Sequence, residues 1–117
     1  MIKRLFVVLS KDEDVASALR FIREHATSGI QVRDVIANAR RSPSTLERRI
    51  KAALGRTIKA EITMTRLHRA KLLLQETGLA VGAVATRSGF SESKYFCEVF
   101  RQNEQMTPTA YRKMFRQ

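Results

Sequence analysis

The chain carries one three-part pattern twice, and this internal repeat restricts its fold more than any other feature. In the downstream copy, small apolar residues at helical spacing (81–88) are followed by Gly89 and by a segment whose phenylalanines lie four residues apart. Glycine reaches positive φ without strain, and Ser91 is suited to cap a new helix. The pattern predicts a helix, a sharp turn and a second helix at about 92–104, which is a helix-turn-helix.

The upstream copy begins at residue 32. Its positions match the downstream copy at an offset of 49 residues before the second helix and 50 within it, which predicts a one-residue slip inside that helix. The matched pairs are Val32 with Val81, Val35 with Val84, Ser42 with Ser91, Leu46 with Phe96, and Ile50 with Phe100. Ser42 and Pro43 form a strong start signal, because the N–H that proline lacks would have no partner there. We therefore expect helices at about 32–39 and 43–54.

The remaining segments predict three more helices. Acidic residues open the segment 12–27 and Ser28-Gly29 closes it, which suits the two ends of an amphipathic helix. A long helix is expected at about 57–77, and Thr107-Pro108 starts a last one. Because no run outside the first residues alternates with period two, the fold class is all-α, with seven helices.

These helices predict two helix-turn-helix subdomains joined by a long central helix. Residues 1–11 are expected to be a leader or the remnant of a linker, because their apolar run is shorter than the roughly 7–15 residues of a signal peptide. The double helix-turn-helix domain then covers 12–117. Its expected parts are subdomain 1 at about 12–56, the linker helix at about 57–77, and subdomain 2 at about 79–117.

The charge of the chain indicates a polyanionic partner. Twenty-two lysines and arginines stand against eleven acids, a net charge of +11, and residues 40–56 alone carry +5. The single cysteine, Cys97, excludes an internal disulfide, and with two histidines it offers no zinc-ligand spacing. We expect a cytoplasmic protein with no metal, no cofactor and no membrane span. It should not be an enzyme, because no nucleophile or carboxylate pair is visible.

The expected length of the central helix fits a double-stranded DNA partner. A helix of about 21 residues rises roughly 30 Å, and successive major grooves on one face of B-DNA lie about 34 Å apart. One chain could therefore read two adjacent half-sites.

Four phrases at fixed spacing are more specific. They are Arg66-Leu67-His68-Arg69-Ala70-Lys71-Leu72-Leu73-Leu74, Val84-Ala85 with Gly89-Phe90, Tyr95-Phe96 with Phe100, and Thr107-Pro108 with Tyr111-Arg112. Together, from about Val15 to Arg112, they resemble the DNA-binding domain of AraC/XylS-type bacterial transcription regulators. Further phrases at 18–23, 29–32 and 44–49 are similar to the xylose operon regulators within that family, which favours a sugar-utilisation operon as the target.

The resemblance implies that the helices at about 43–54 and 92–104 lie in successive major grooves. We also expect double-stranded DNA and RNA polymerase as partners. If the chain is a fragment of a larger regulator, an effector-sensing domain belongs to the missing part; if the chain is complete, control comes through its abundance or a partner. Carried over by position, the base-facing residues are Ser44, Glu47, Arg48, Ser93, Lys94, Tyr95 and Glu98.

Side-chain chemistry agrees with these positions. Arg48 and Lys94 can donate to guanine, and Glu47 or Glu98 can accept from cytosine. Thr45 or Tyr95 can touch a thymine methyl group. Candidates for phosphate contacts, which set register and affinity, are Arg40, Arg41, Arg49, Lys51 and Arg101.

Three positions depart from the family pattern. Arg40-Arg41 stands where the family commonly has glycine and an apolar residue, and Gln105 stands where it usually has glycine, so the helix before Gln105 is expected to end under strain or differently. Glu98 puts a carboxylate on the reading face. An internal ion pair with an arginine is the alternative for Glu47 and Glu98. For the whole chain the alternative is a basic helical adaptor that binds an acidic protein or an anionic surface without sequence specificity.

Overall fold

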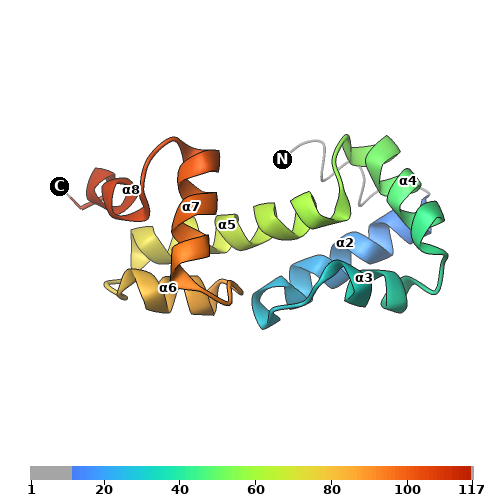
Figure 1. Cartoon of the computed structure of the whole chain (residues 1–117), viewed down its shortest axis with the longest axis horizontal. Helices are drawn as coiled ribbons and strands as arrows, with labels where there is room; N and C mark the ends of the chain where they lie inside the picture. The colour runs from blue at the N-terminus through green and yellow to red at the C-terminus, as the bar shows by residue number, and fades with distance from the viewer. Residues whose placement is uncertain (1–11, 117) are drawn as a thin grey trace. The chain divides into compact units, whose positions relative to one another are not determined.

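The computed structural model describes residues 12–116, and within that range it is all-α, as the repeat predicts (Figure 1). The expected leader, residues 1–11, lies outside the described residues. The described part contains seven α-helices and one 3-10 turn, labelled as in Figure 1. Their bounds are α2 Glu13–His25, η1 Ala26–Ser28, α3 Val32–Ala39, α4 Pro43–Leu54, α5 Ile58–Glu76, α6 Val81–Arg87, α7 Ser93–Glu104 and α8 Pro108–Met114. None of these helices combines the length and the apolar character needed to cross a membrane.

The described residues form two compact units. Unit 1 comprises residues 12–26 and 30–65, and unit 2 comprises 27–29 and 66–116. Helix α5 contributes its first half to unit 1 and its second half to unit 2, so one uninterrupted helix supplies core residues to both (Figure 1).

The core of unit 1 joins α2, α3, α4 and the start of α5. Helices α2, α4 and α5 contribute buried residues that recur every three or four positions, and α3 contributes Val35, so that the apolar faces can close around a common interior. The buried residues are Val15, Ala18, Leu19, Ile22, Ala26, Val35, Leu46, Ile50, Leu54, Ile58 and Ile62.

The core of unit 2 repeats this plan with larger side chains. The rings of Phe96 and Phe100 are fully buried, and ring centroids 5.0 Å and 5.7 Å apart link Phe90 to Phe96 and Phe96 to Phe100. Helix α5 supplies the aliphatic side of the same core. The buried residues are Leu67, Ala70, Leu73, Leu74, Val84, Ala85, Phe90, Phe96, Val99 and Phe100.

The start of α4 confirms the cap prediction. Ser42 has extended backbone, its Oγ accepts from the Thr45 N–H at 3.3 Å, and Pro43 occupies the first turn. Helix α2 starts in the same way, because an Asp12 carboxylate oxygen accepts from the Val15 N–H at 3.2 Å. Both caps satisfy N–H groups that have no partner within the helix.

The start of α7 differs from the start that the sequence predicts. Ser91 was expected to cap this helix, but the N-cap is Glu92, and no side-chain hydrogen bond closes it. Helices α4 and α7 both have 12 residues, starting at Pro43 and Ser93. The one-residue slip between the repeats therefore lies in the turn before α7 and not inside the helix. The longer turn moves Ser91 one position too early to act as the cap.

Two pairs of equivalent positions in the two units have left-handed backbone. In each unit, glycine occupies one of these positions and a residue with a side chain occupies the other. In unit 1 these are Arg40 (φ 57°) after α3 and Gly55 (φ 76°) after α4. In unit 2 they are Gly89 (φ 102°) before α7 and Gln105 (φ 65°) after it. The predicted strain at Gln105 is therefore present, and Arg40 bears a similar strain, because a Cβ atom disfavours this conformation.

Candidate nucleic-acid interface

Helix α4 presents a polar stripe opposite its buried stripe. Leu46, Ile50 and Leu54 recur every four residues and are buried in unit 1. Helical spacing places the opposite positions on one outer face. These residues are exposed: Ser44, Glu47, Arg48 and Lys51. The face therefore offers a hydroxyl, a carboxylate and two cations to a partner.

Helix α7 has the same design in unit 2. Phe96, Val99 and Phe100 are buried, and Cys97 is half-buried against the same core. The exposed residues include Ser93, Lys94, Tyr95, Glu98 and Arg101. All four base-contact candidates predicted on this helix are therefore accessible.

The two helices differ in charge although their lengths agree. Counting from the first residue of each helix, Lys51 matches Arg101, but Arg48 matches Glu98. Helix α4 has three cations and one carboxylate, a net charge of +2, whereas α7 has two of each and a net charge of zero. Attraction to a polyanion is thus concentrated on α4.

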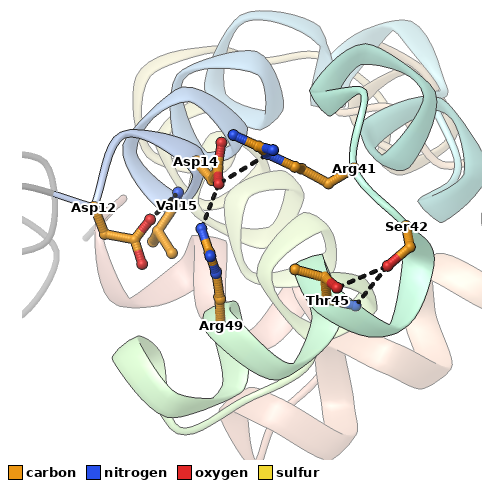
Figure 2. A network of polar contacts seen from close by, with 7 residues as sticks. All are labelled: Asp12, Asp14, Val15, Arg41, Ser42, Thr45 and Arg49. Carbon is orange, nitrogen blue, oxygen red and sulfur yellow. Dashed lines mark hydrogen bonds and ion pairs between the residues drawn. The ribbon is translucent and has the colours of Figure 1, made fainter.

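Two of the predicted phosphate contacts, Arg41 and Arg49, share an internal partner that the sequence did not reveal. The Oδ2 atom of Asp14 accepts from Arg49 Nη1 at 2.5 Å and from Arg41 Nε at 3.1 Å (Figure 2). The Asp14 side chain is 17% exposed, while the arginine side chains remain about half exposed. One carboxylate therefore links α2, the turn after α3, and α4.

The remaining candidates of unit 1 differ in accessibility. Arg40 is exposed beside the turn. Thr45 is only half-buried, and its Oγ1 accepts from the Ser42 hydroxyl at 2.7 Å, which ties it to the cap of α4 (Figure 2). Its methyl group remains the part suited to an apolar contact.

The alternative for Glu47 and Glu98 is not realised in the described part of the chain. The ion pairs among residues 12–116 involve other acids, and neither Glu47 nor Glu98 forms one. Both side chains are exposed. Each carboxylate is thus available to a partner.

Tyr95 lies at the start of α7, and Arg66 on α5 lies near it. Its ring is 46% exposed and stands 6.2 Å, between centroids, from the ring of Phe90. Burial lowers the pKa of the Arg66 guanidinium below its usual value, and the neighbouring Tyr95 acts in the opposite direction. Arg66, which the sequence shows only as the first residue of the phrase at 66–74, is a half-buried cation that adjoins the reading-face candidate Tyr95.

The second half of α5 is also tied to α7 and α8. Lys71 Nζ lies 3.3 Å from Glu104 at the end of α7, and Gln75 Nε2 donates to the Tyr111 hydroxyl at 2.6 Å. Arg112 Nε donates to the Leu74 carbonyl at 3.2 Å, which satisfies one acceptor at the end of α5. These contacts hold α7 and α8 against α5, and they explain why the phrase at 107–112 accompanies the long helix.

The chain is similar to known regulatory proteins. A family described as "Helix-turn-helix domain" matches residues 36–114. The xylose operon regulatory protein of Escherichia coli (strain K12) is 37% identical over 101 residues, which is 86% of this chain and 26% of the relative. The chain thus spans about a quarter of that protein.

Solved structures agree with the sequence matches. The C-terminal domain of AraT, a response regulator from Geobacillus stearothermophilus, superposes with a TM-score of 0.85 at 29% identity, covering 90% of this chain and 88% of that one. The DNA-binding domain of AdpA, a global transcriptional factor solved in complex with a target DNA, gives a TM-score of 0.84 at 27% identity, covering 90% and 95%.

Proposed function

The chain belongs to the AraC-type helix-turn-helix family, and on that premise we propose that it binds double-stranded DNA sequence-specifically as the DNA-binding domain of a bacterial transcription regulator. The observation that carries the proposal is the repeated exposed face: α4 and α7 each bury one stripe and leave polar, hydrogen-bonding side chains outside. The structure of AdpA, whose title names a target DNA, supports the same partner here.

In this proposal α4 and α7 are the recognition helices of the two units. They read successive major-groove segments, which is supported by the rise of about 28 Å expected for a helix of α5's length. Arg48 and Lys94 donate to guanine, Glu47 and Glu98 accept from cytosine, and Thr45 and Tyr95 contact thymine methyl groups. Ser44 and Ser93, one near the start of each helix, hydrogen-bond to either base type.

Affinity comes from a separate set of cations. Phosphate contacts carry no sequence information, but they position the protein on the duplex and make its affinity depend on salt concentration. The proposed set is Arg40, Arg41, Arg49, Lys51 and Arg101, all of which are exposed.

The biological setting follows from the relatives. The similarity to the xylose operon regulatory protein supports a sugar-utilisation operon as the target, with RNA polymerase as a further partner and the cytoplasm as the location. An effector-sensing domain outside this chain is proposed on the same ground, since the chain matches only 26% of that relative. No cofactor and no catalytic step enter this function.

Selection of duplexes from a random DNA pool tests the proposal. We expect two enriched blocks about ten base pairs apart, one for each recognition helix. Arg48→Ala with Lys94→Ala should lower affinity for the selected site and relax preference in both blocks. The matched control is Arg20→Ala with Arg23→Ala, which removes two exposed cations from α2.

The outcomes separate the proposal from its alternative. One enriched block would mean that one unit only clamps the backbone. No enrichment, with equal binding to anionic vesicles, would reject the proposal and favour the basic adaptor. Unchanged binding by the Arg48 and Lys94 double variant would reject the residue assignment alone.

A further inference from the structure

Asp14 occupies a special place among the acids of unit 1. Its Oδ2 atom accepts from a guanidinium nitrogen of Arg41 at 3.1 Å and of Arg49 at 2.5 Å, as Figure 2 shows. Arg41 belongs to the turn between α3 and α4, Arg49 belongs to α4, and Asp14 lies in the first turn of α2. Side chains 27 and 35 residues away from Asp14 thus converge on a single oxygen.

This geometry brings two like charges together. Two nitrogens bonded to one oxygen must lie close to each other, and the guanidinium groups would repel without the carboxylate between them. Asp14 lies in the first turn of α2, where the helix dipole attracts an acidic side chain. The three groups together keep a net charge of +1, so they still attract an anion.

Much of each arginine remains available to a partner. A guanidinium has five N–H donors, and in these contacts Arg41 uses Nε and Arg49 uses Nη1. The side chains are 55% and 45% exposed, whereas Asp14 is largely covered. The carboxylate thus lies on the inner side of the pair, and the outer N–H groups can reach solvent.

We propose that Asp14 is a positioning residue that holds Arg41 and Arg49 together as a clamp for one phosphate group of the DNA backbone. The inference rests on the proposed function. It explains why Arg41 and Arg49 share one carboxylate: their side chains are ordered before DNA binds. Ordering long side chains in advance removes a cost that binding would otherwise bear. Asp14 itself does not contact DNA.

A competing model predicts the opposite change in DNA affinity when Asp14 is removed. If Asp14 only neutralised the arginines and repelled phosphate, its removal would strengthen binding. If it positions them, its removal weakens binding although the chain becomes more positive. Whether a substitution of Asp14 raises or lowers the affinity for DNA therefore distinguishes the two models.

The experiment compares Asp14→Asn with Glu13→Gln. Glu13 is an exposed acid in the same helical turn, so its variant changes the net charge equally without touching the arginines. The whole chain is titrated with a short synthetic duplex of arbitrary sequence at several salt concentrations. We expect Asp14→Asn to bind about tenfold more weakly than Glu13→Gln, since two arginines must then be ordered on binding. Its log–log salt slope should fall by no more than about one.

A double-mutant cycle shows whether Asp14 acts through the arginines. In an Arg41→Gln, Arg49→Gln background, Asp14→Asn should cause no further weakening. Asp14→Glu keeps the charge and the first-turn acid but displaces the carboxylate, so an intermediate loss is expected. It also serves as the test variant if Asp14→Asn fails to unfold cooperatively on heating.

Each result has one meaning. Binding by Asp14→Asn as tight as, or tighter than, that of Glu13→Gln overturns the positioning role and leaves the phosphate contacts standing. Unchanged affinity and salt slope in the Arg41, Arg49 double variant overturns both the clamp and the assignment of these arginines. Sequence selection by the wild-type chain is a separate readout, so failure of the proposed function itself is recognised independently.

Discussion

Arg40 and Gly89 hold the same place in the two repeats, each following the first helix of its helix-turn-helix, and both have left-handed backbone, with φ of 57° and 102°. The turn geometry is therefore a requirement of the motif and not a consequence of glycine. Unit 1 meets it with a residue whose Cβ atom resists that conformation.

Replacing Arg40 with glycine should stabilise unit 1. The substitution relieves the Cβ contact with the backbone, but it also removes a charge, so Arg40→Ala is the matched control. We expect Arg40→Gly to exceed Arg40→Ala by about 1 kcal/mol in the free energy of unfolding. Urea denaturation of both variants provides the measurement, and equal stabilities would mean that the turn relaxes around alanine.

Gly82→Ala and Gly29→Ala should have opposite effects on stability. A Cβ atom added at either glycine meets nothing within 4 Å, so steric crowding does not distinguish the two substitutions. Gly82 lies inside α6, which Ala80 leaves without a side-chain cap, and alanine there should add about 1 kcal/mol. Gly29 has φ of +81°, so alanine should lower stability by about 1 kcal/mol. Thermal unfolding of both variants checks the signs; two changes of the same sign would contradict the argument.

Arg56→Met should destabilise unit 1 through Glu61. The Glu61 side chain is fully buried and ion-paired with Arg56, whose side chain is 38% exposed. Removing one partner of a buried pair costs about 3–5 kcal/mol, and the exposure of Arg56 places the expected loss near 2 kcal/mol.

The double variant Arg56→Met, Glu61→Leu tests the cause. If the loss comes from the buried carboxylate, changing both residues should recover most of the stability, because no buried charge remains. A double variant less stable than Arg56→Met would show that the further contacts of Glu61 outweigh the cost of its buried charge. Chemical denaturation measures each step.

Glu98→Gln should tighten binding to duplex DNA. Glu98 is exposed on the outer face of α7, at the position where α4 has Arg48. If α7 binds DNA as proposed, the negative charge of Glu98 repels the phosphates of any duplex, whereas its hydrogen bond to cytosine is available only at a matching site. The matched control is Glu76→Gln, which neutralises an exposed acid at the end of α5 in the same unit. We expect a roughly two- to fivefold larger gain at Glu98 on a duplex of arbitrary sequence. An equal gain for both variants would place Glu98 away from the DNA.

Local signals predicted most of the helix boundaries. Ser42 and Pro43 act on neighbouring N–H groups, so their effect can be inferred from sequence alone, and α4 begins where they predict. The prediction that Ser91 caps α7 was wrong for an equally local reason. The turn before α7 is one residue longer than its counterpart, and the repeat alignment had placed that residue inside the helix.

The contacts that organise the candidate interface could not be predicted in the same way. Asp14 is one of the acids that open the segment 12–27, and the sequence predicts no more than that, because its partner Arg49 lies 35 residues away and meets it only in the folded unit. The sequence pattern also does not show that Glu61 and Arg66 are covered by the fold. Their roles come from burial, and a charged residue in a helical pattern is usually assigned to the surface.

The unequal charge of α4 and α7 implies that the two recognition helices contribute differently to binding. Attraction to phosphates does not depend on base sequence, and of the two helices it is stronger for α4, which has the larger excess of cations. Helix α7, whose charges balance, depends more on hydrogen bonds that only matching bases can complete. Non-specific affinity and base selection should therefore come in different proportions from the two recognition helices of one chain.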